Sequence, residues 1–344
     1  MGESTNGPEG VRAWRGGEVE SLHRVHAALV REGRMVARHG DPSTRAYLRS
    51  SAKPIQALPL VEEGLVERYG FTPQEIAVMA ASHNGETFHL DAVRSILEKA
   101  GLEEDRLRCG PHPPMHEPSA RALRDAGCEP AAIHNNCSGK HAGMLAVCRA
   151  KGWPLDSYRD ADHPLQVRIR DTVAELAGVD PGSIGIGVDG CGVPCFALPV
   201  TAMAAAFDAL ARHDASRAGE RGRAVGAVLD AMAAHAEYVA GTGRACTTIL
   251  AKAGRRVVVK TGAEGVFAAV LRAAGGAEPA GLALKVADGA RRAQDVAIAT
   301  LLADLGILQA GADEAVDDLL RPAVENRAGE VVGHLDADLP LRAP

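Results

Sequence analysis

Apolar and polar positions follow two different patterns along the chain. Short apolar runs lie near its two ends, where turn residues separate them in pairs. Arg31-Glu32-Gly33 separates the first pair and Thr261–Gly265 the second, so each pair predicts a β-hairpin. A fifth run predicts one more strand. In chain order, the five runs are LHRVHAALV (22–30), RMVARHG (34–40), RRVVVK (255–260), VFAAVLRA (266–273) and LALKVAD (282–288).

The middle of the chain has the apolar spacing of helices. Thr72-Pro73-Gln74-Glu75 is a capping box with proline at the first helical position, so a helix is expected to begin there. Another helix is expected over roughly residues 289–305. Four further helical segments end at a glycine suited to a helix C-terminus. They are DAVRSILEKAG (91–101), HAGMLAVCRAKG (141–152), DHPLQVRIRDTVAELAG (162–178) and RAVGAVLDAMAAHAEYVAG (223–241).

This order of elements predicts an α+β fold. Its antiparallel sheet is expected to combine N- and C-terminal segments, with a helical lobe inserted between them. We expect a flexible N-terminal arm over residues 1–18 and a single catalytic unit over 19–344. Within that unit, the sheet lobe would cover about 19–50 and 244–344, and the helical lobe about 51–243.

The composition excludes several classes of protein. The 344 residues carry a net charge of −6 and no basic cluster with interleaved aromatics, which argues against nucleic acid as a partner. The N-terminus lacks the apolar core of a signal peptide, and no apolar run is long enough to span a membrane. The seven cysteines are odd in number and lack a disulfide-framework spacing, which favours a reducing compartment. We therefore expect a cytoplasmic protein without membrane contact.

Ser50-Ser51-Ala52-Lys53 places a lysine in the first turn of an expected helix, where the helix dipole already supplies positive charge. Ser50 and Lys53 are three residues apart and share one helix face. A neutral lysine there could take the serine proton and make Ser50 a nucleophile. Such a base needs a pKa near neutrality instead of the usual value of about 10.4, and burial, the dipole and a second cation all lower it. The alternative for this motif alone is a solvated helix start.

Two further motifs follow in the chain. Ser82-His83-Asn84 ends a helical segment, and Lys260-Thr261-Gly262 closes a strand. Taken singly, the first is also a common helix end before an Asn-Gly turn, and the second an ordinary hairpin turn. Together with Ser50-x-x-Lys53, they match in order the S-x-x-K, S-x-N and K-T-G set of serine β-lactamases and penicillin-binding proteins. The gap between Ser50 and Ser82 is short for those enzymes, which favours the same chemistry on another acyl substrate.

Two polar stretches that contain cysteine lie within apolar flanks, HNNCSGKH (134–141) and VDGCGVPC (188–195). Their side chains include possible zinc ligands. The spacing matches no standard zinc motif, and small buried thiols are the alternative. The candidate ligands by residue type are His134, Cys137, His141, Cys191 and Cys195.

Five segments together resemble the asparaginase II family, the Rhizobium etli-type L-asparaginases. They are YLRSSAKPIQALPL, SHNGE, HNNCSGKHAGML, GVDGCGVPCFALP and VVVKTGAEG, and the resemblance runs in order from about Leu22 into the last helices. It implies hydrolysis of L-asparagine to L-aspartate and ammonia. It also implies a β-lactamase-like fold and a homodimer.

The resemblance also assigns residues to the reaction. A first Ser-Lys pair falls on Ser50 and Lys53, with Ser50 as the expected nucleophile, and a second pair falls on Ser82 and Lys260. Family members hold one zinc ion with two cysteines and a lysine, and these positions fall on Cys137, Lys140 and Cys191. Three neighbours of the motifs are expected to contact the substrate: Arg49, His83 and Asp189.

Three other functions remain open from the sequence. A glutaminase-like amidase would differ only in the length of the substrate pocket. A penicillin-interacting serine hydrolase would share the Ser and Lys motifs, but it would be exported. A non-catalytic zinc-binding protein would make those motifs coincidental.

Overall fold

The structure is a computed structural model that describes residues 9–273 and 277–344. Its strands are β1 (Gly10–Arg15), β2 (Glu18–His23), β3 (Val25–Arg31), β4 (Arg34–His39), β5 (Arg45–Tyr47), β6 (Gly185–Val188), β7 (Pro194–Pro199), β8 (Val257–Thr261), β9 (Val266–Leu271), β10 (Ala280–Val286), β11 (Ala323–Glu325) and β12 (Val331–Asp338). Short 3-10 helices are η1 (Arg49–Ala52), η2 (Glu104–Arg106), η3 (Ala132–His134), η4 (Pro181–Ser183) and η5 (Gly254–Arg256).

The α-helices occupy most of the middle of the chain. They are α1 (Lys53–Gln56), α2 (Leu58–Glu62), α3 (Leu65–Tyr69), α4 (Pro73–Met79), α5 (Thr87–Lys99), α6 (Glu117–Asp125), α7 (Ser138–Lys151), α8 (Pro164–Ala177), α9 (Val200–Ser216), α10 (Gly219–Ala234), α11 (Ala236–Val239), α12 (Ala245–Ala253), α13 (Arg291–Asp304) and α14 (Glu314–Leu320). None of the helices in the described ranges is both long and apolar enough to cross a membrane.

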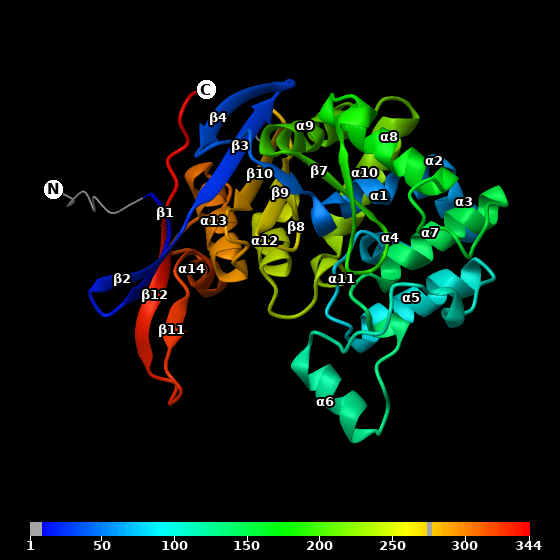
Figure 1. Ribbon diagram of the computed structural model, residues 1–344, viewed down its shortest axis with the longest axis horizontal. Coiled ribbons are helices and arrows are strands. Elements are labelled where there is room, and N and C mark those ends of the chain that lie inside the picture. Colours follow the sequence, from blue (N-terminus) through cyan, green and yellow to red (C-terminus); the bar gives the residue numbers. More distant parts are fainter. Residues whose placement is uncertain (1–8, 274–276) are drawn as a thin grey trace.

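The strands form three antiparallel sheets (Figure 1). The five-stranded sheet has the order β4-β3-β10-β9-β8, so the N-terminal hairpin pairs with strands from the last third of the chain. Along this seam Ala28 of β3 lies opposite Ala283 of β10. The structure therefore confirms the α+β class and a sheet built from both ends of the chain.

Both predicted hairpins are present. Glu32 and Gly33, between β3 and β4, have φ values of 50° and 74°. Two left-handed residues in a two-residue turn match the right-handed twist of the flanking strands. Between β8 and β9, Glu264 and Gly265 have φ values of 58° and 72°. The second turn holds Glu264 in an exposed position between the two strands.

Small residues let a helix approach the sheet closely. Helix α9 packs against β3, β9 and β10. A Cβ atom added to Gly281 of β10 would lie 2.1 Å from the backbone nitrogen of Asp208 in α9, so only glycine fits there. The low aromatic content of the chain, 3%, fits a core built from closely spaced Ala, Val and Leu.

The helical segments follow the sequence prediction with one correction. Thr72 caps α4 as expected, because its hydroxyl accepts from the Glu75 backbone nitrogen and Glu75 accepts in return from the Thr72 nitrogen at 2.6 Å. The segment expected as one helix to Gly241 breaks instead at His235. After this break, the backbone oxygen of Val239 accepts from the Ser82 nitrogen at 3.0 Å, so the irregular backbone helps to fix the segment with Ser82.

Two boundaries of the predicted organisation are also corrected. Part of the arm expected over residues 1–18 is strand β1, which lies between β2 and β12 and buries Val11 and Ala13; residues 1–8 lie outside the described range. Arg12, between these two apolar residues, is buried as well, and its Nε donates to Asp336 Oδ1 of β12 at 2.8 Å. The helical lobe contains β6 and β7, which form a three-stranded sheet with β5 in the order β5-β7-β6.

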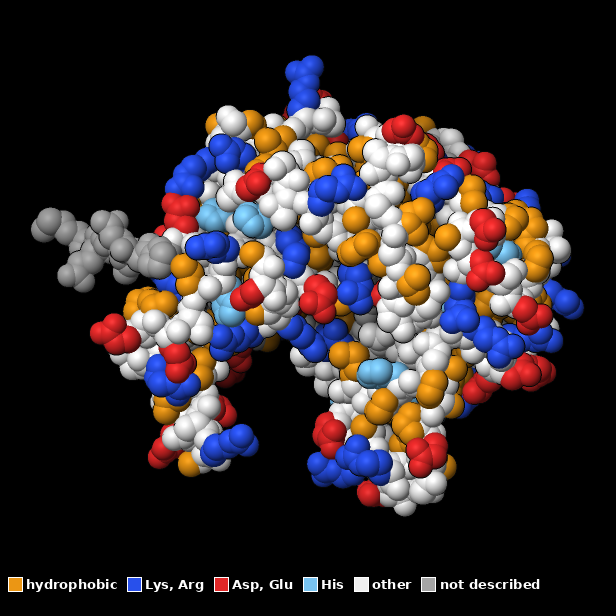
Figure 2. All heavy atoms as spheres, viewed as in Figure 1, with side chains coloured by type: hydrophobic (Ala, Val, Ile, Leu, Met, Phe, Trp, Pro, Cys, Tyr) orange, Lys and Arg blue, Asp and Glu red, His pale blue; other side chains and the backbone are white. Residues whose placement is uncertain are grey.

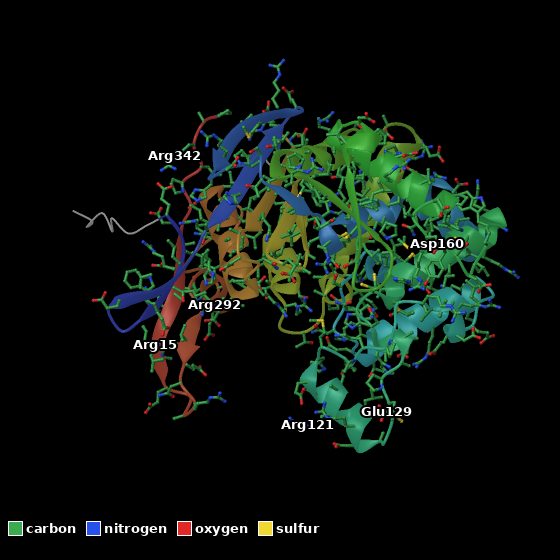
Figure 3. The ribbon with its side chains drawn as sticks, in the orientation of Figure 1. Arg15, Arg121, Glu129, Asp160, Arg292 and Arg342 are labelled. Carbon is green, nitrogen blue, oxygen red and sulfur yellow. The ribbon has the colours of Figure 1, made fainter. Side chains whose placement is uncertain are left out.

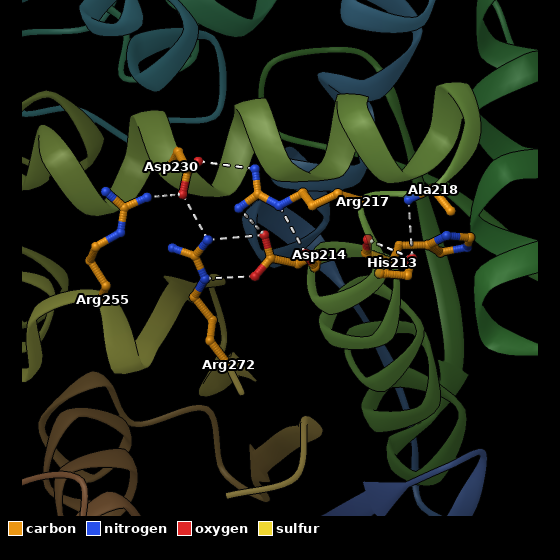
Figure 4. Close-up of polar contacts among 8 residues, drawn as sticks. His213, Asp214, Arg217, Ala218, Asp230, Arg255 and Arg272 are labelled. Carbon is orange, nitrogen blue, oxygen red and sulfur yellow. Dashed lines mark hydrogen bonds and ion pairs between the residues drawn. The ribbon is translucent and has the colours of Figure 1, made fainter. Parts of the chain in front are cut away.

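A buried ionic cluster joins the helical lobe to the end of strand β9 in the five-stranded sheet (Figure 4). Arg272 follows β9, and its guanidinium donates to Asp214 of α9 at 2.7 and 2.9 Å and to Asp230 of α10 at 2.7 Å. Arg217 and the more exposed Arg255 add further contacts to the same carboxylates. Because buried charges are stable only when paired, this cluster fixes α9 and α10 relative to β9.

Candidate active site

One cavity of about 290 Å³ contains the two serines of the first two motifs. It lies where η1, the segment after α4, the β8–β9 turn and the start of α13 meet. The space-filling view shows a hollow between two protrusions of the molecule, one formed by α6 and the other by β11 and β12 (Figure 2). The residues that line the cavity are Ser50, Ser82, Met115, Asn136, Arg244, Thr261, Gly262, Ala263, Glu264, Gly289, Arg291 and Gln294.

Ser50 lies in η1, directly before α1, so the S-x-x-K motif does begin a helix. Arg49 has a φ of 49°, which is a costly left-handed conformation for a residue other than glycine and is typical of functional sites. Ser50 lines the cavity, whereas the Ser51 hydroxyl donates to the Leu48 oxygen at 2.6 Å and is fully buried. The two adjacent serines therefore have different environments.

Ser82 lies between two buried lysines. Its Oγ accepts from Lys53 Nζ at 3.0 Å and from Lys260 Nζ at 2.9 Å. Lys53 also donates to the oxygens of Ala81 and Asn136, and both lysine side chains are 0% exposed. The structure thus brings three of the four expected catalytic residues into one network. In the described ranges no hydrogen bond joins Lys53 to Ser50, which lines the same cavity.

Burial lowers the pKa of both lysines. The pKa of Lys53 lies below its usual value, and the charge of Lys140 acts in the same direction, although nearby thiols oppose it. Burial lowers the pKa of Lys260 to about 7, with a further contribution from Lys53 and opposition from Cys246. An amine with a pKa near neutrality can accept and release protons at physiological pH, which is what a general base requires.

The three residues expected to contact substrate lie around the cavity but do not line it. Arg49 Nε donates to Asp189 Oδ1 at 2.9 Å, and this pair is largely buried. His83 is 0% exposed, with Nε2 bonded to Ser138 Oγ at 3.0 Å and Nδ1 accepting from the Gly85 nitrogen. This arrangement gives His83 a role in holding the Ser82 segment.

Cys137, Lys140 and Cys191 come together beside the Ser-Lys network. Lys140 Nζ donates to Cys191 Sγ at 3.0 Å, and Cys137 Sγ donates to Asn136 Oδ1 at 3.2 Å. The two thiols lie close enough to shift each other's pKa. All three side chains are buried. In the part of the chain that the structure describes, no three His, Cys, Asp or Glu side chains are grouped to hold a metal. A metal site here therefore depends on Lys140 as the third donor.

The charges of this cluster fit a metal site. A hydrogen bond from Cys191 and the nearby lysines hold the pKa of Cys137 well below its usual value. Burial lowers the pKa of Lys140, but the charges of the two cysteines outweigh it and raise that pKa. The hydrogen bond to Cys137 raises the pKa of Cys191. Zinc would therefore have to displace a proton from Lys140 and one from Cys191, and two sulfurs with an amine nitrogen are chemically suitable donors.

The remaining candidate ligands from the sequence do not join this cluster. His141 Nδ1 is bonded to the Tyr158 hydroxyl at 2.6 Å, and His134 Nδ1 accepts from the Ala131 nitrogen at 2.9 Å. Cys195 lies on β7 opposite Gly187.

Sequence reasoning missed the charged wall of the cavity. Arg244, Glu264 and Arg291 line it together with Ser50 and Ser82. They come from the start of α12, the β8–β9 turn and the start of α13, which are far apart from the serines in sequence. No sequence spacing relates them, although the turn residues around Glu264 belong to the VVVKTGAEG segment.

No curated protein matches this chain. Among solved structures, Mglu in its tris and glutamate form is 15% identical over 89% of this chain, with a TM-score of 0.45, and this chain spans 65% of that protein's length. A probable glutaminase from Bacillus subtilis, complexed with 6-diazo-5-oxo-L-norleucine, is 14% identical over 85% of this chain and 88% of its own, with a TM-score of 0.41.

One family model, described as L-asparaginase II, matches residues 11–337. The match includes all of the Ser, Lys and Cys residues described above, together with the strands at both ends of the chain. The chain therefore belongs to the L-asparaginase II family.

Proposed function

We propose that this protein is an L-asparaginase that hydrolyses L-asparagine to L-aspartate and ammonia. The observation that carries the proposal is the position of Ser82 between Lys53 and Lys260 in a cavity that also contains Ser50. Membership of the L-asparaginase II family supports the choice of substrate. The test is the release of ammonia from L-asparagine by the purified protein, compared with L-glutamine.

The proposed reaction proceeds through an ester. The Ser50 oxygen attacks the side-chain amide carbon while Lys53 takes the hydroxyl proton. The C–N bond then breaks, and a proton delivered through Ser82 and Lys260 lets the nitrogen leave as ammonia. Water attacks the resulting β-aspartyl ester and restores Ser50. Catalytic hydrogen bonds often tighten only when substrate binds, so the present separation of Ser50 from Lys53 is compatible with this route.

The fold is proposed to be β-lactamase-like. Three placements support this: Ser50-x-x-Lys53 begins a helix, Ser82-x-Asn84 follows one, and Lys260-Thr261-Gly262 ends strand β8. The motif order matches that of serine β-lactamases and penicillin-binding proteins. We also propose that the protein is cytoplasmic, which its cysteine content favours, and that it acts as a homodimer, as the family resemblance implies.

We propose one zinc ion per chain, held by Cys137, Lys140 and Cys191. The buried cluster of two sulfurs and one amine supports it. When bound, zinc would supply a fixed positive charge and Lewis acidity beside the cavity. Lys53 contacts the backbone oxygen of Asn136, the residue before Cys137, so the metal-binding segment and the Ser-Lys network are directly connected.

Protein purified without chelator is expected to contain about one zinc ion per chain, because the three donors leave room for a fourth ligand. Cys137→Ser or Cys191→Ser should remove most of it, since each deletes a sulfur ligand. Cys148→Ser is the matched control, because Cys148 is equally buried and lies on the same helix as Lys140. Elemental analysis measures the metal directly. Full zinc occupancy in Cys191→Ser would contradict the assignment.

The pH profile of kcat/KM should rise as Lys53, the base that takes the Ser50 proton, loses its own proton, and burial of Lys53 lowers its pKa and so moves this rising limb below the usual range of lysine. Two neighbouring amines lose their first proton at lower pH than one amine alone, because repulsion favours the loss. Lys260→Met removes this repulsion and should raise the pKa of Lys53. The rising limb of kcat/KM should therefore move to higher pH.

The exposed Lys252, which pairs with Asp313, provides the control, and Lys252→Met should leave the profile unchanged. If the limb of Lys260→Met stays in place or moves to lower pH, the two lysines are not coupled and the mechanism reduces to Ser50 and Lys53 alone.

A further inference from the structure

The cavity contains charged groups that the proposed chemistry does not use. Arg244, Arg291 and Glu264 line it, whereas the described hydrogen bonds of Ser82 involve only Lys53 and Lys260 and the backbone of Val239. Breaking an amide requires a nucleophile and proton transfer, and the Ser-Lys network supplies both. The two cations and the anion on the wall are therefore available for binding the rest of the substrate.

Arg244 is held in a fixed position relative to Ser82. Its Nη1 donates to Asn84 Oδ1 at 2.8 Å, and Asn84 in turn donates to the Thr242 oxygen at 2.9 Å. Asn84 is only two residues after Ser82 and is itself buried. Within this short segment, Ser82 thus contributes its hydroxyl to the Ser-Lys network, and Asn84 holds the guanidinium of Arg244. A rigid cation loses little conformational freedom when it binds an anion.

Neither arginine has a paired carboxylate within the described ranges. The polar partners of Arg244 are Asn84 and the sulfur of Met115. Burial lowers the pKa of Arg244, and Arg291 acts in the same direction. Asp295 lies close enough to influence both, but it makes no ion pair with them, and burial raises its own pKa. Arg244 is a partly buried cation without a counterion, which is unfavourable, and an anion that enters the cavity would relieve this cost.

Glu264 supplies the opposite charge. It is exposed at the β8–β9 turn. Its Oε2 lies close to Gly289, because a Cβ atom added to that glycine would be only 2.9 Å from it. In the described part of the chain its carboxylate makes no hydrogen bond or ion pair, although its backbone oxygen accepts from Lys285 Nζ at 2.7 Å. It is the one carboxylate among the residues described as lining the cavity.

We propose that Arg244 and Arg291 bind the α-carboxylate of the substrate, that Glu264 binds its α-ammonium group, and that the cavity therefore selects free α-amino acids with a side-chain amide. This inference rests on the proposed amide hydrolysis at Ser50, and it adds the residues that recognise the two charged groups of the amino-acid substrate. A cavity of about 290 Å³ with both signs of charge matches a small zwitterion. Peptide-bound asparagine, which lacks both free charges, is expected to be excluded.

The test uses three amides of nearly equal size. L-Asparagine carries both charged groups, 3-aminopropanamide lacks the α-carboxylate, and succinamic acid lacks the α-ammonium group. Arg244→Met should lower kcat/KM by about 50-fold for asparagine and succinamic acid, the range expected for a lost charge-assisted hydrogen bond, and leave 3-aminopropanamide nearly unchanged. Glu264→Gln should show the complementary pattern, with about a 10-fold loss on asparagine and 3-aminopropanamide and little change on succinamic acid.

Arg292→Met is the matched control, because Arg292 is adjacent to Arg291 but its Nε donates to His23 Nε2 at 3.1 Å. Arg292 lies beside the sheet of β1 and β2, away from helix α6, which carries Arg121 (Figure 3). It should leave all three substrates unchanged. The exposed Arg291 provides a second variant if Arg244→Met is unstable, and Arg291→Met should repeat the carboxylate-dependent loss at a smaller size.

The outcomes separate the two proposals. An equal loss on all three amides in both Arg244→Met and Arg291→Met would overturn the carboxylate assignment while leaving asparagine hydrolysis intact. Wild-type protein that releases ammonia from none of the three amides would overturn the proposed function, and the subsite with it.

Discussion

Ser50→Ala is expected to lower kcat for L-asparagine by about 10⁴-fold or more, the usual effect of removing a catalytic nucleophile. Without the hydroxyl no ester can form, and Ser82 cannot substitute because its oxygen already accepts from two lysines. The fold should be unaffected, since Ser50 makes no side-chain hydrogen bond in the described ranges and a deleted oxygen leaves little empty space. Steady-state ammonia release and a thermal melt measure the two quantities.

Ser51→Ala is the control for Ser50→Ala. Ser51 is fully buried and donates to the Leu48 oxygen at 2.6 Å, so its loss should cost about 1 kcal/mol of stability and leave substantial activity. Complete loss of activity in both variants, with both proteins folded, would refute Ser50 as the specific nucleophile. Full activity of Ser50→Ala together with an inactive Ser82→Ala would assign the attack to Ser82 instead.

Lys53→Met should reduce kcat by about 10³- to 10⁴-fold at every pH, because the base that takes the Ser50 proton is gone. Methionine fills most of the volume of lysine with an unbranched side chain and avoids a buried charge, so the folded state should persist. The loss should not be recovered at high pH, in contrast to the shifted profile of Lys260→Met. The measurement is kcat across the pH range for both variants.

Lys53→Arg tests whether the amine acts as a base or only as a cation. Arginine keeps the positive charge and the donor to Ser82, but it does not lose its proton in proteins. If Lys53→Arg retains activity near that of the wild type, the role of Lys53 is electrostatic and the proposed base is wrong.

The sequence predicted the parts of the fold that local rules determine. Arg31-Glu32-Gly33 and the capping box of Thr72 and Glu75 formed as expected, because turn and cap preferences act over a few residues. It did not predict β1, whose partner β12 lies at the other end of the chain. It also missed the break at His235, where the Val239 carbonyl is needed by Ser82. The strand β1 and the break at His235 both depend on contacts between residues more than a hundred positions apart, and such contacts leave no local pattern in the sequence.

In the candidate site too, the sequence predicted the residues of local motifs and missed the residues that only the fold brings together. The three motifs come together as their chemical signatures implied. Ser50 and Ser82 line one cavity, and Lys260 donates a hydrogen bond to Ser82. Arg244 and Glu264 could not be predicted, because a single arginine at a helix start or a glutamate in a turn looks like a solvated residue. Only the folded chain shows that Asn84 holds Arg244 against the cavity. The sequence placed His83 near the site but could not show that its ring faces Ser138.

The central claim is that the Ser-Lys network hydrolyses the side-chain amide of L-asparagine. Its most direct test is ammonia release by the wild-type protein from L-asparagine and L-glutamine, with Ser50→Ala as the blank and with labelled penicillin as a competing acylating agent. We predict Ser50-dependent release of ammonia from L-asparagine, at a higher kcat/KM than from L-glutamine, and no stable labelling by penicillin. No release from L-asparagine above the Ser50→Ala blank would contradict the account.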